Sequence, residues 1–203
     1  MKNKKKELIR RQVDKLGIPP KELVRKEIAR YERKESYKKL ALGVLTGLVA
    51  AVAVIIIITN LWLAVLQVDG SSMNPLLKMD DIVVAVRGGN PVRTDVIAFY
   101  NDNMLHIKRV IAVAGDKVDI DAAGKVSVNG KKLNEPYIAE PSLGSCDIEL
   151  PFTVPAGAVF VMGDNRPSSK DSRSKQFGTV SRSQIVGIVK TKIWPVPRMG
   201  NVS

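Results

Sequence analysis

The chain has 203 residues, room for one folded domain with appendages, and a formal net charge of +12. Residues 1–39 hold fifteen Lys and Arg against six Asp and Glu, and because this basic stretch precedes a long apolar run, composition favours contact with a membrane over contact with nucleic acid. A single cysteine, Cys146, excludes an internal disulfide, and with only one histidine a structural zinc site is not expected.

The basic segment, residues 1–39, is predicted to form two amphipathic helices. Lys-Glu-Leu-Ile-Arg at 6–10 recurs as Lys-Glu-Leu-Val-Arg at 21–25, and apolar residues follow each copy at i, i+4, i+7 spacing. Such helices would lie on anionic headgroups or form a partner-binding hairpin. A charged, solvated tail is the alternative. A DNA-binding helix-turn-helix is disfavoured, because neither helix has enough apolar surface for a core.

Residues 40–60 are predicted to be a transmembrane anchor. No charged residue occurs between Leu40 and Val68, and Leu40–Thr59 has about the twenty residues that a helix needs to cross the hydrocarbon. The run exceeds the about 7–15 apolar residues of a cleaved signal peptide and lacks an Ala-x-Ala-like exit, so we expect an uncleaved anchor. Because the Lys and Arg precede the span, we expect a single-pass protein of the cell membrane with a cytoplasmic N-terminus.

Residues 61–203 are predicted to form an extracytoplasmic, β-rich domain, with Trp62 at the membrane interface and 63–68 as a possible first strand. Val- and Ile-rich runs predict strands at 81–87, 95–100, 105–114, 117–121, 125–128, 131–133, 159–162 and 184–193. Asn129-Gly130 is a strong signal for a type I′ hairpin. The proline-rich residues 134–157 are expected to form a loop-rich insertion. Strands this closely spaced favour a coiled antiparallel β-sheet or partly open barrel.

A short polar bend, Asp69-Gly70-Ser71-Ser72-Met73-Asn74-Pro75, follows the apolar run directly. A nucleophilic serine needs a small neighbour, a tight turn and free backbone N–H groups. Gly70 and Ser71 can supply the first two, and the amide of Ser72 can supply the third. Taken alone, the bend favours a connector between a membrane helix and a strand over a nucleophile.

The stretch around Lys108 offers a base. In a strand, Met104, His106 and Lys108 share one face. A lysine that faces inward among apolar neighbours has a lowered pKa, and its neutral amine can take a proton from a serine hydroxyl. The alternatives are an ordinary surface lysine, or His106 as the base of a Ser-His-Asp triad. We assign the base role to Lys108 and expect His106 to line the substrate cleft with Met73.

A third polar stretch, residues 163–173, is dense in Gly, Asp, Asn and Ser and follows the predicted strand at 159–162. It is either a long solvated loop or a loop whose side-chain hydrogen bonds support a site.

These stretches together resemble the sequence boxes of the type I signal peptidases, in the family's order and over residues 65–192. Ser72-Met73-Asn74-Pro75 is similar to the Ser-Met-x-Pro box. Ile107-Lys108-Arg109-Val110 with Gly115-Asp116 is similar to the Lys-Arg-Val…Gly-Asp box, and Gly163-Asp164-Asn165-Arg166 with Asp171-Ser172-Arg173 to the Gly-Asp-Asn-Arg…Asp-Ser-Arg box. The resemblance is specific because the three boxes occur together, and a weaker fourth box lies at 95–99.

The resemblance implies a serine endopeptidase with a Ser-Lys dyad, in which Ser72 is the nucleophile and Lys108 the general base. It places a hydroxyl that orients the lysine amine at Ser169. Asp171 and Arg173 fall on a supporting ion pair, and Arg166 on a further supporting position.

The resemblance also bears on the oxyanion hole, the cofactor and the substrate. Some members use a serine hydroxyl two residues before the nucleophile; here that position is Gly70, so the Ser72 amide is the expected donor. No metal or organic cofactor is implied. The implied substrates are exported preproteins, cut after a small-x-small motif. A catalytically silent homologue and a membrane-tethered β binding or assembly module are the alternatives.

Overall fold

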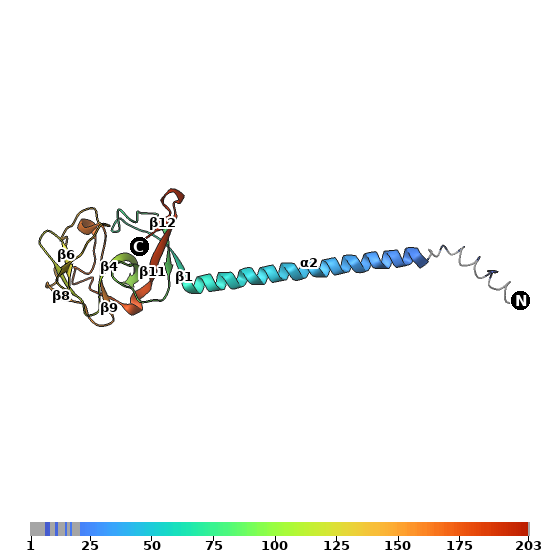
Figure 1. The fold of residues 1–203 in the computed structure, drawn as a ribbon, viewed down its shortest axis with the longest axis horizontal. Coiled ribbons are helices and arrows are strands. Elements are labelled where there is room, and N and C mark those ends of the chain that lie inside the picture. The colour runs from blue at the N-terminus through green and yellow to red at the C-terminus, as the bar shows by residue number, and fades with distance from the viewer. Residues whose placement is uncertain (1–6, 9–10, 12–14, 16, 18–20, 203) are drawn as a thin grey trace. The chain divides into compact units, whose positions relative to one another are not determined.

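The structure is a computed structural model that describes residues 7–8, 11, 15, 17 and 21–202. The chain divides into two compact units, residues up to Ile57 and residues from Ile58 onward, and the ribbon is drawn in Figure 1. The expected start of the outer domain, residue 61, lies three positions from this division. The first predicted basic helix, with the separator at 17–20, lies mostly outside the described residues.

Helix α2 (Lys21–Trp62) runs for 42 residues without a break. It passes from the basic segment into the apolar run at residues 39–40, because neither segment contains a proline after Pro20 or a capping signal that would end a helix. Its segment Ile28–Thr59 has a mean hydropathy of 2.9 in its most apolar window, and no residue of that window is buried. Among the described residues, it is the one helix long and apolar enough to cross a membrane.

The second unit is built on a large antiparallel sheet in the order β1-β2-β11-β3-β4-β9-β10, with β12 paired to β11. Its strands are β1 (Leu63–Gln67), β2 (Ile82–Val86), β3 (Val96–Asn101), β4 (Met104–Val113), β9 (Ala158–Met162), β10 (Val180–Ser181), β11 (Ile185–Trp194) and β12 (Gly200–Asn201). The sheet is open, since β1 and β10 are its two ends.

A smaller sheet, in the order β7-β6-β5-β8, lies on the side of the domain away from β1 (Figure 1). Its strands are β5 (Lys117–Ile120), β6 (Val126–Val128), β7 (Lys131–Lys132) and β8 (Phe152–Thr153). The turn between β6 and β7 is Asn129-Gly130, and both residues have positive φ, 53° and 75°. This is the backbone of a type I′ turn and confirms the predicted hairpin.

The fold class is confirmed: the domain is mostly antiparallel β-sheet and does not close into a barrel. Every predicted strand is present, and each of its ends lies within one residue of the predicted end. The sequence did not predict β8, β10 and β12, which have two residues each, or the 3₁₀ turns η1 (Arg166–Ser168), η2 (Arg182–Gln184) and η3 (Val196–Arg198). Two-residue strands are too short to show a period.

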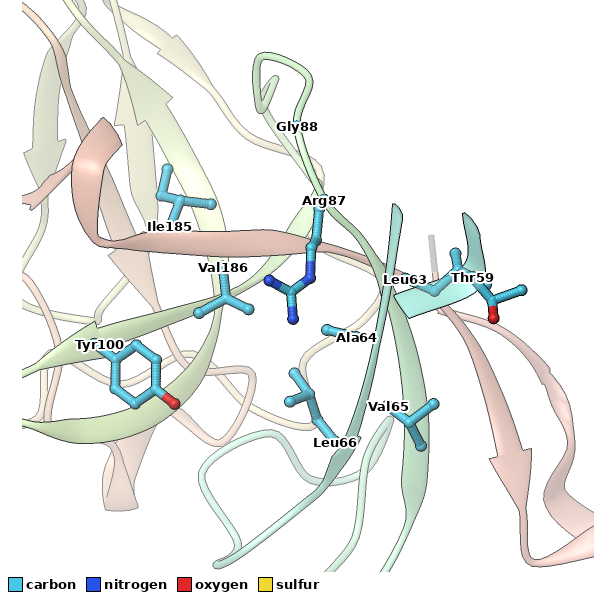
Figure 2. Close-up of a pocket in the computed structure, with 10 residues that line it drawn as sticks. All are labelled: Thr59, Leu63, Ala64, Val65, Leu66, Arg87, Gly88, Tyr100, Ile185 and Val186. Carbon is cyan, nitrogen blue, oxygen red and sulfur yellow. The ribbon is translucent and has the colours of Figure 1, made fainter. Parts of the chain in front are cut away.

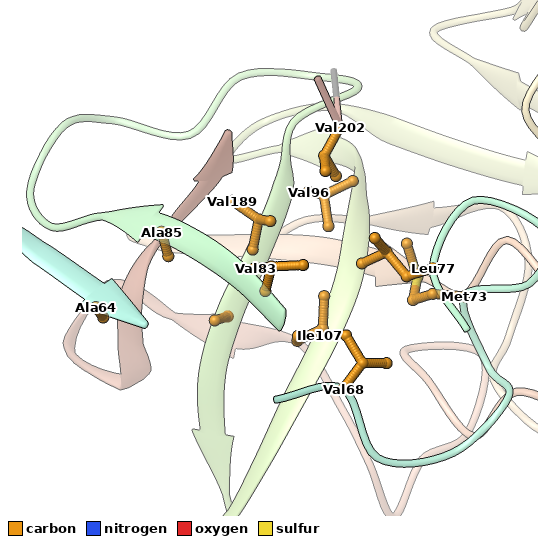
Figure 3. Close-up of a cluster of buried hydrophobic side chains, with 11 residues drawn as sticks. Ala64, Val68, Met73, Leu77, Val83, Ala85, Val96, Ile107, Val189 and Val202 are labelled. Atoms are coloured by element: carbon orange, nitrogen blue, oxygen red, sulfur yellow. The ribbon is translucent and has the colours of Figure 1, made fainter. Parts of the chain in front are cut away.

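The apolar core beside β1 fixes the polar bend in place. Met73 and Leu77 are 2% and 0% exposed and pack with Val68 and Ile107 (Figure 3). The amide of Leu77 donates to the carbonyl of Met73 at 2.9 Å, which closes one turn across the bend. Ser72 directly precedes Met73, so the burial of the Met73 side chain fixes the position of Ser72.

Candidate active site

Ser72 lies in the turn after β1, and two hydrogen bonds tie this turn to the third polar stretch. Asn165 donates its amide to the carbonyl of Ser72 at 3.0 Å and its side-chain Nδ2 to the carbonyl of Ser71 at 3.1 Å. Gly70 has a φ of +93°, a conformation that residues with a Cβ rarely adopt. The turn is thus fixed from the core side by Met73 and from the loop side by Asn165.

Lys108 is brought to Ser72 by strand β4, thirty-six residues further along the chain. Its Nζ lies 2.6 Å from the Oγ of Ser72. The residue is 3% exposed and lies opposite the fully buried Ile97 of β3. The predicted serine and the predicted base are therefore in direct hydrogen-bond contact.

The environment lowers the pKa of Lys108 from 10.5 to about 8. The main cause is burial, which removes water from the charged ammonium. The carboxylates of Asp171 and Asp164 act in the opposite direction, and the guanidinium of Arg173 lowers the pKa further. At pH 8, about half of the amine is neutral and able to accept a proton.

Asp171 and Arg173 form a buried ion pair that shapes the loop at 163–173. Nε of Arg173 lies 2.8 Å from Oδ1 of Asp171, and both side chains are fully buried. Oδ2 of Asp171 also accepts the amide of Gly163 at 3.0 Å. Arg173 donates to the carbonyl of Arg166 at 2.9 Å. The pair therefore holds both ends of the loop segment that carries Ser169.

Arg166 is held by a residue that the sequence analysis missed. Its Nε donates to the carbonyl of Gly163 at 3.1 Å, and its guanidinium forms an ion pair with Glu135, which is largely buried. Glu135 also accepts the hydroxyl of Tyr137 at 3.0 Å. Glu135 belongs to the stretch predicted only as a loop-rich insertion, and no periodicity or motif there marks it as a partner of Arg166.

A second buried ion pair, also missed, joins β4 to the same loop. Arg109 follows Lys108, and its guanidinium binds both carboxylate oxygens of Asp164, at 2.8 and 2.7 Å. The guanidinium carbon lies 4.0 Å from the centre of the Tyr137 ring, a cation–π contact. This bidentate pair joins β4 to the 163–173 loop at the residue next to Lys108.

Ser169 is buried beside the dyad, but its hydroxyl has no hydrogen-bond partner among the described residues. A Cβ placed on Gly163 would lie 2.3 Å from the Oγ of Ser169 and 2.5 Å from the carbonyl oxygen of Ser72. Ser169 and the backbone of Ser72 therefore both lie close to Gly163. Its predicted bond to Lys108 is absent from the part of the chain described.

His106 is placed away from a triad geometry. Its ring centre lies 5.9 Å from that of Phe99 and 5.4 Å from that of Phe177. Burial, followed by the charge of Lys108, lowers its pKa. In the described residues, no hydrogen bond connects His106 to Ser72 or to a carboxylate. The titratable side chain that is hydrogen-bonded to Ser72 is Lys108, whose Nζ donates to the Ser72 Oγ.

A cavity of about 420 Å³ opens beside the dyad. One wall is formed by residues 67–69 with Ser72 and Met73, and the other by residues 104–108 of β4, which include His106 and Lys108. Both predicted cleft residues therefore line the same cavity as the dyad. Met73 does so from the core, with only 2% of its surface exposed.

Comparisons with known proteins identify the family of the chain. Residues 41–194 match the family described as signal peptidase, peptidase S26. A probable signal peptidase I-2 of Synechocystis sp. is 35% identical over 145 residues, which is 66% of this chain and 64% of the relative. Signal peptidase IB of Staphylococcus aureus (strain COL) is 33% identical over 178 residues, 78% of this chain and 92% of the relative. The chain belongs to the peptidase S26 family of signal peptidases.

A solved structure of a signal peptidase I from Enterococcus faecalis V583 is 31% identical, with a TM-score of 0.41. The alignment covers 49% of this chain and 97% of the solved chain.

Proposed function

We propose that the chain is a membrane-anchored endopeptidase that removes signal peptides from exported preproteins, with Ser72 as nucleophile and Lys108 as general base. The observation that carries this proposal is the 2.6 Å contact between Ser72 Oγ and a buried Lys108 Nζ whose pKa is about 8. Membership of the signal peptidase family gives the class of substrate.

The reaction begins with proton transfer from Ser72 to neutral Lys108. As Nζ accepts the proton, Oγ attacks the scissile carbonyl and forms a tetrahedral intermediate. The ammonium then returns the proton to the leaving amine, which departs with the mature protein. The acyl group stays on Ser72. Lys108, neutral again, takes a proton from water, whose oxygen attacks the ester. As the bond between the acyl carbon and Ser72 Oγ breaks, the ammonium returns the proton to Oγ, and the signal peptide leaves with a new carboxyl terminus.

The oxyanion of each intermediate needs a hydrogen-bond donor. The amide of Ser72 has no acceptor among the described residues, so it is available for this role. Gly70, two residues earlier, has no side chain to add a second donor, and its positive φ disfavours a residue that would. We therefore assign the Ser72 amide as the principal donor. In one studied protease, the loss of a donor lowers kcat by about 10²–10³-fold.

The site supports binding of an extended peptide. Strand β1 is an edge strand that pairs only with β2, and residues 104–108 of β4 pair only with β3. The cavity lies between these two strands, so a substrate can add as a further strand to their free edges. Val68, Met73 and Ile107 close the core beneath the cavity. We propose that the small side chains of a small-x-small motif lie against these residues.

The anchor and its charges suggest the topology. Fifteen Lys and Arg precede the apolar part of α2, so we propose a single pass with residues 1–39 in the cytoplasm and residues 61–203 outside. The turn with Ser72 follows the end of α2 by ten residues. In this topology the site meets substrates whose apolar segments already lie in the same bilayer, so the search becomes local.

Cleavage of a precursor with Ala at positions −1 and −3 tests the proposal. The wild-type chain in detergent or lipid should cut after the −1 residue, and Leu at −1 should lower kcat/KM by at least about tenfold, because the proposed specificity is for a small side chain at −1. His106→Ala should retain cleavage, because Lys108 is the base. No cleavage of the Ala precursor would indicate a silent homologue or binding module. Loss of cleavage in His106→Ala would revive the histidine base.

A further inference from the structure

A second, larger cavity of about 790 Å³ lies where helix α2 gives way to strand β1 (Figure 2). Residues 63–66 of β1 form one wall, and Tyr100, Ile185 and Val186 form the opposite one. Thr59, in the last turn of the apolar span, also lines it. The cavity is separate from the dyad, and the proposed catalytic mechanism does not use it.

Arg87 is fixed at the level of the helix end. Its amide donates to the carbonyl of Trp62, the last residue of α2, at 2.8 Å. The preceding residue, Val86, is paired with Leu63. Because the apolar span ends at Thr59, this level is that of the lipid headgroups when α2 crosses the bilayer.

The side chain of Arg87 points into this cavity, toward Leu66 and Val186 (Figure 2). In the described part of the chain, its guanidinium has no ion pair or hydrogen bond, and no Asp or Glu lines the cavity. Five arginines of the domain are neutralised by carboxylates: Arg93 by Asp116, Arg109 by Asp164, Arg166 by Glu135, Arg173 by Asp171 and Arg198 by Asp81. Arg182 is exposed like Arg87, but it does not line this cavity. Arg87 therefore presents an uncompensated positive charge.

The remaining lining suits the part of a lipid next to its phosphate. Leu66 and Val186 are only partly buried and Tyr100 is 53% exposed, so apolar side chains and a phenol remain open at this level. The hydroxyl of Tyr100 lies on the cavity side of its ring (Figure 2). A guanidinium matches the two free oxygens of a phosphodiester, and an amphipathic tyrosine is favoured at the interface.

We propose that this cavity binds one phospholipid through its phosphodiester, with Arg87 as the anion-binding residue, Tyr100 at the rim, and Leu66 and Val186 against the glycerol and first methylenes. The site would attach the catalytic domain to the outer leaflet close to β1, the strand that leads to Ser72.

Native mass spectrometry of the full chain in dodecyl maltoside tests this site. Palmitoyl-oleoyl phosphatidylglycerol is titrated against the wild type, Arg87→Gln and, as a matched control, Arg182→Gln, an exposed arginine outside this cavity. The wild type and the control should each retain one tightly held phospholipid. Arg87→Gln should bind it at least about tenfold more weakly, since the charge-assisted bonds are lost. Because Arg87 is exposed, the variant should fold normally.

Four results would overturn the proposal. The first is equal phospholipid binding by Arg87→Gln and wild type. The second is equal retention of a diacylglycerol with the same chains, which would mean that the phosphate is not recognised. The third is displacement of the phospholipid by millimolar inorganic phosphate, which would make a free anion the ligand. The fourth is slower precursor cleavage by Arg87→Gln with unchanged lipid binding, which would assign the cavity to the substrate.

Discussion

Replacing Ser72 by Ala, or Lys108 by Met, is expected to lower kcat/KM for a precursor by about 10⁴-fold or more. Each substitution removes one member of a nucleophile–base pair, and such members act as a unit. Lys108→Met keeps the length of the side chain and fills the same buried space, so the amine is the part that is lost. Cleavage is measured by the appearance of the mature product under single-turnover conditions.

The controls for this prediction are the residue before Ser72 and a lysine of the 163–173 loop. Ser71→Ala and Lys170→Ala alter exposed side chains next to the site without touching the dyad. Both should cleave at rates close to the wild type. Activity of Lys108→Met near that of the wild type would remove Lys108 from the mechanism. A loss in Lys170→Ala equal to that in Lys108→Met would point to charge or folding instead of a base.

The substitution Gly163→Ala is expected to lower kcat by about 10²-fold or more, although Gly163 carries no reacting atom. Its new Cβ would lie 2.3 Å from Ser169 Oγ, 2.6 Å from Ser169 Cβ and 2.5 Å from the Ser72 carbonyl oxygen. Two of these atoms belong to backbone or to a Cβ and cannot rotate away. The loop or the Ser72 turn must shift, and a displacement of about 1 Å in a catalytic site can cost about 10²-fold in rate.

Gly200→Ala is the matched control, because a Cβ at Gly200 meets no atom within 4 Å. Both variants are compared by kcat and by thermal unfolding, so that a displaced site is distinguished from an unfolded chain. Gly163→Ala should stay folded at the assay temperature and lose kcat, whereas Gly200→Ala should match the wild type in both. Full kcat in Gly163→Ala would mean that the loop and the Ser72 turn do not need this close approach.

Local patterns predicted much of the fold. Alternation of Val and Ile marked the long strands, and Asn129-Gly130 specified its own turn because both residues tolerate positive φ. The change from charged to apolar residues near position 40 did not mark a structural break, since both compositions support a helix, and α2 runs through it. The change in composition indicates where the chain passes from water into the membrane, but the backbone hydrogen bonds of the helix continue across that point.

The site was predicted less completely than the fold. The resemblance of the three boxes suggested the pairing of Ser72 with Lys108, and in the structure Ser72 Oγ and Lys108 Nζ lie 2.6 Å apart. Glu135 could not be found, because its ion pair with Arg166 spans a loop without any period and depends on the folded path of that loop. Ser169 was placed near the dyad, yet the direction of its hydroxyl depends on backbone geometry that no spacing encodes.

The pH dependence of kcat/KM for precursor cleavage is the sharpest test of Lys108 as the general base. A protonated Lys108 cannot accept the Ser72 proton, so the rate should rise with pH and reach half of its plateau near pH 8, the pKa of the buried amine in the free enzyme. The same midpoint should persist in His106→Ala. A midpoint near 10.5, the ordinary value for lysine, or one near 6.5 that vanishes in His106→Ala, would contradict the account.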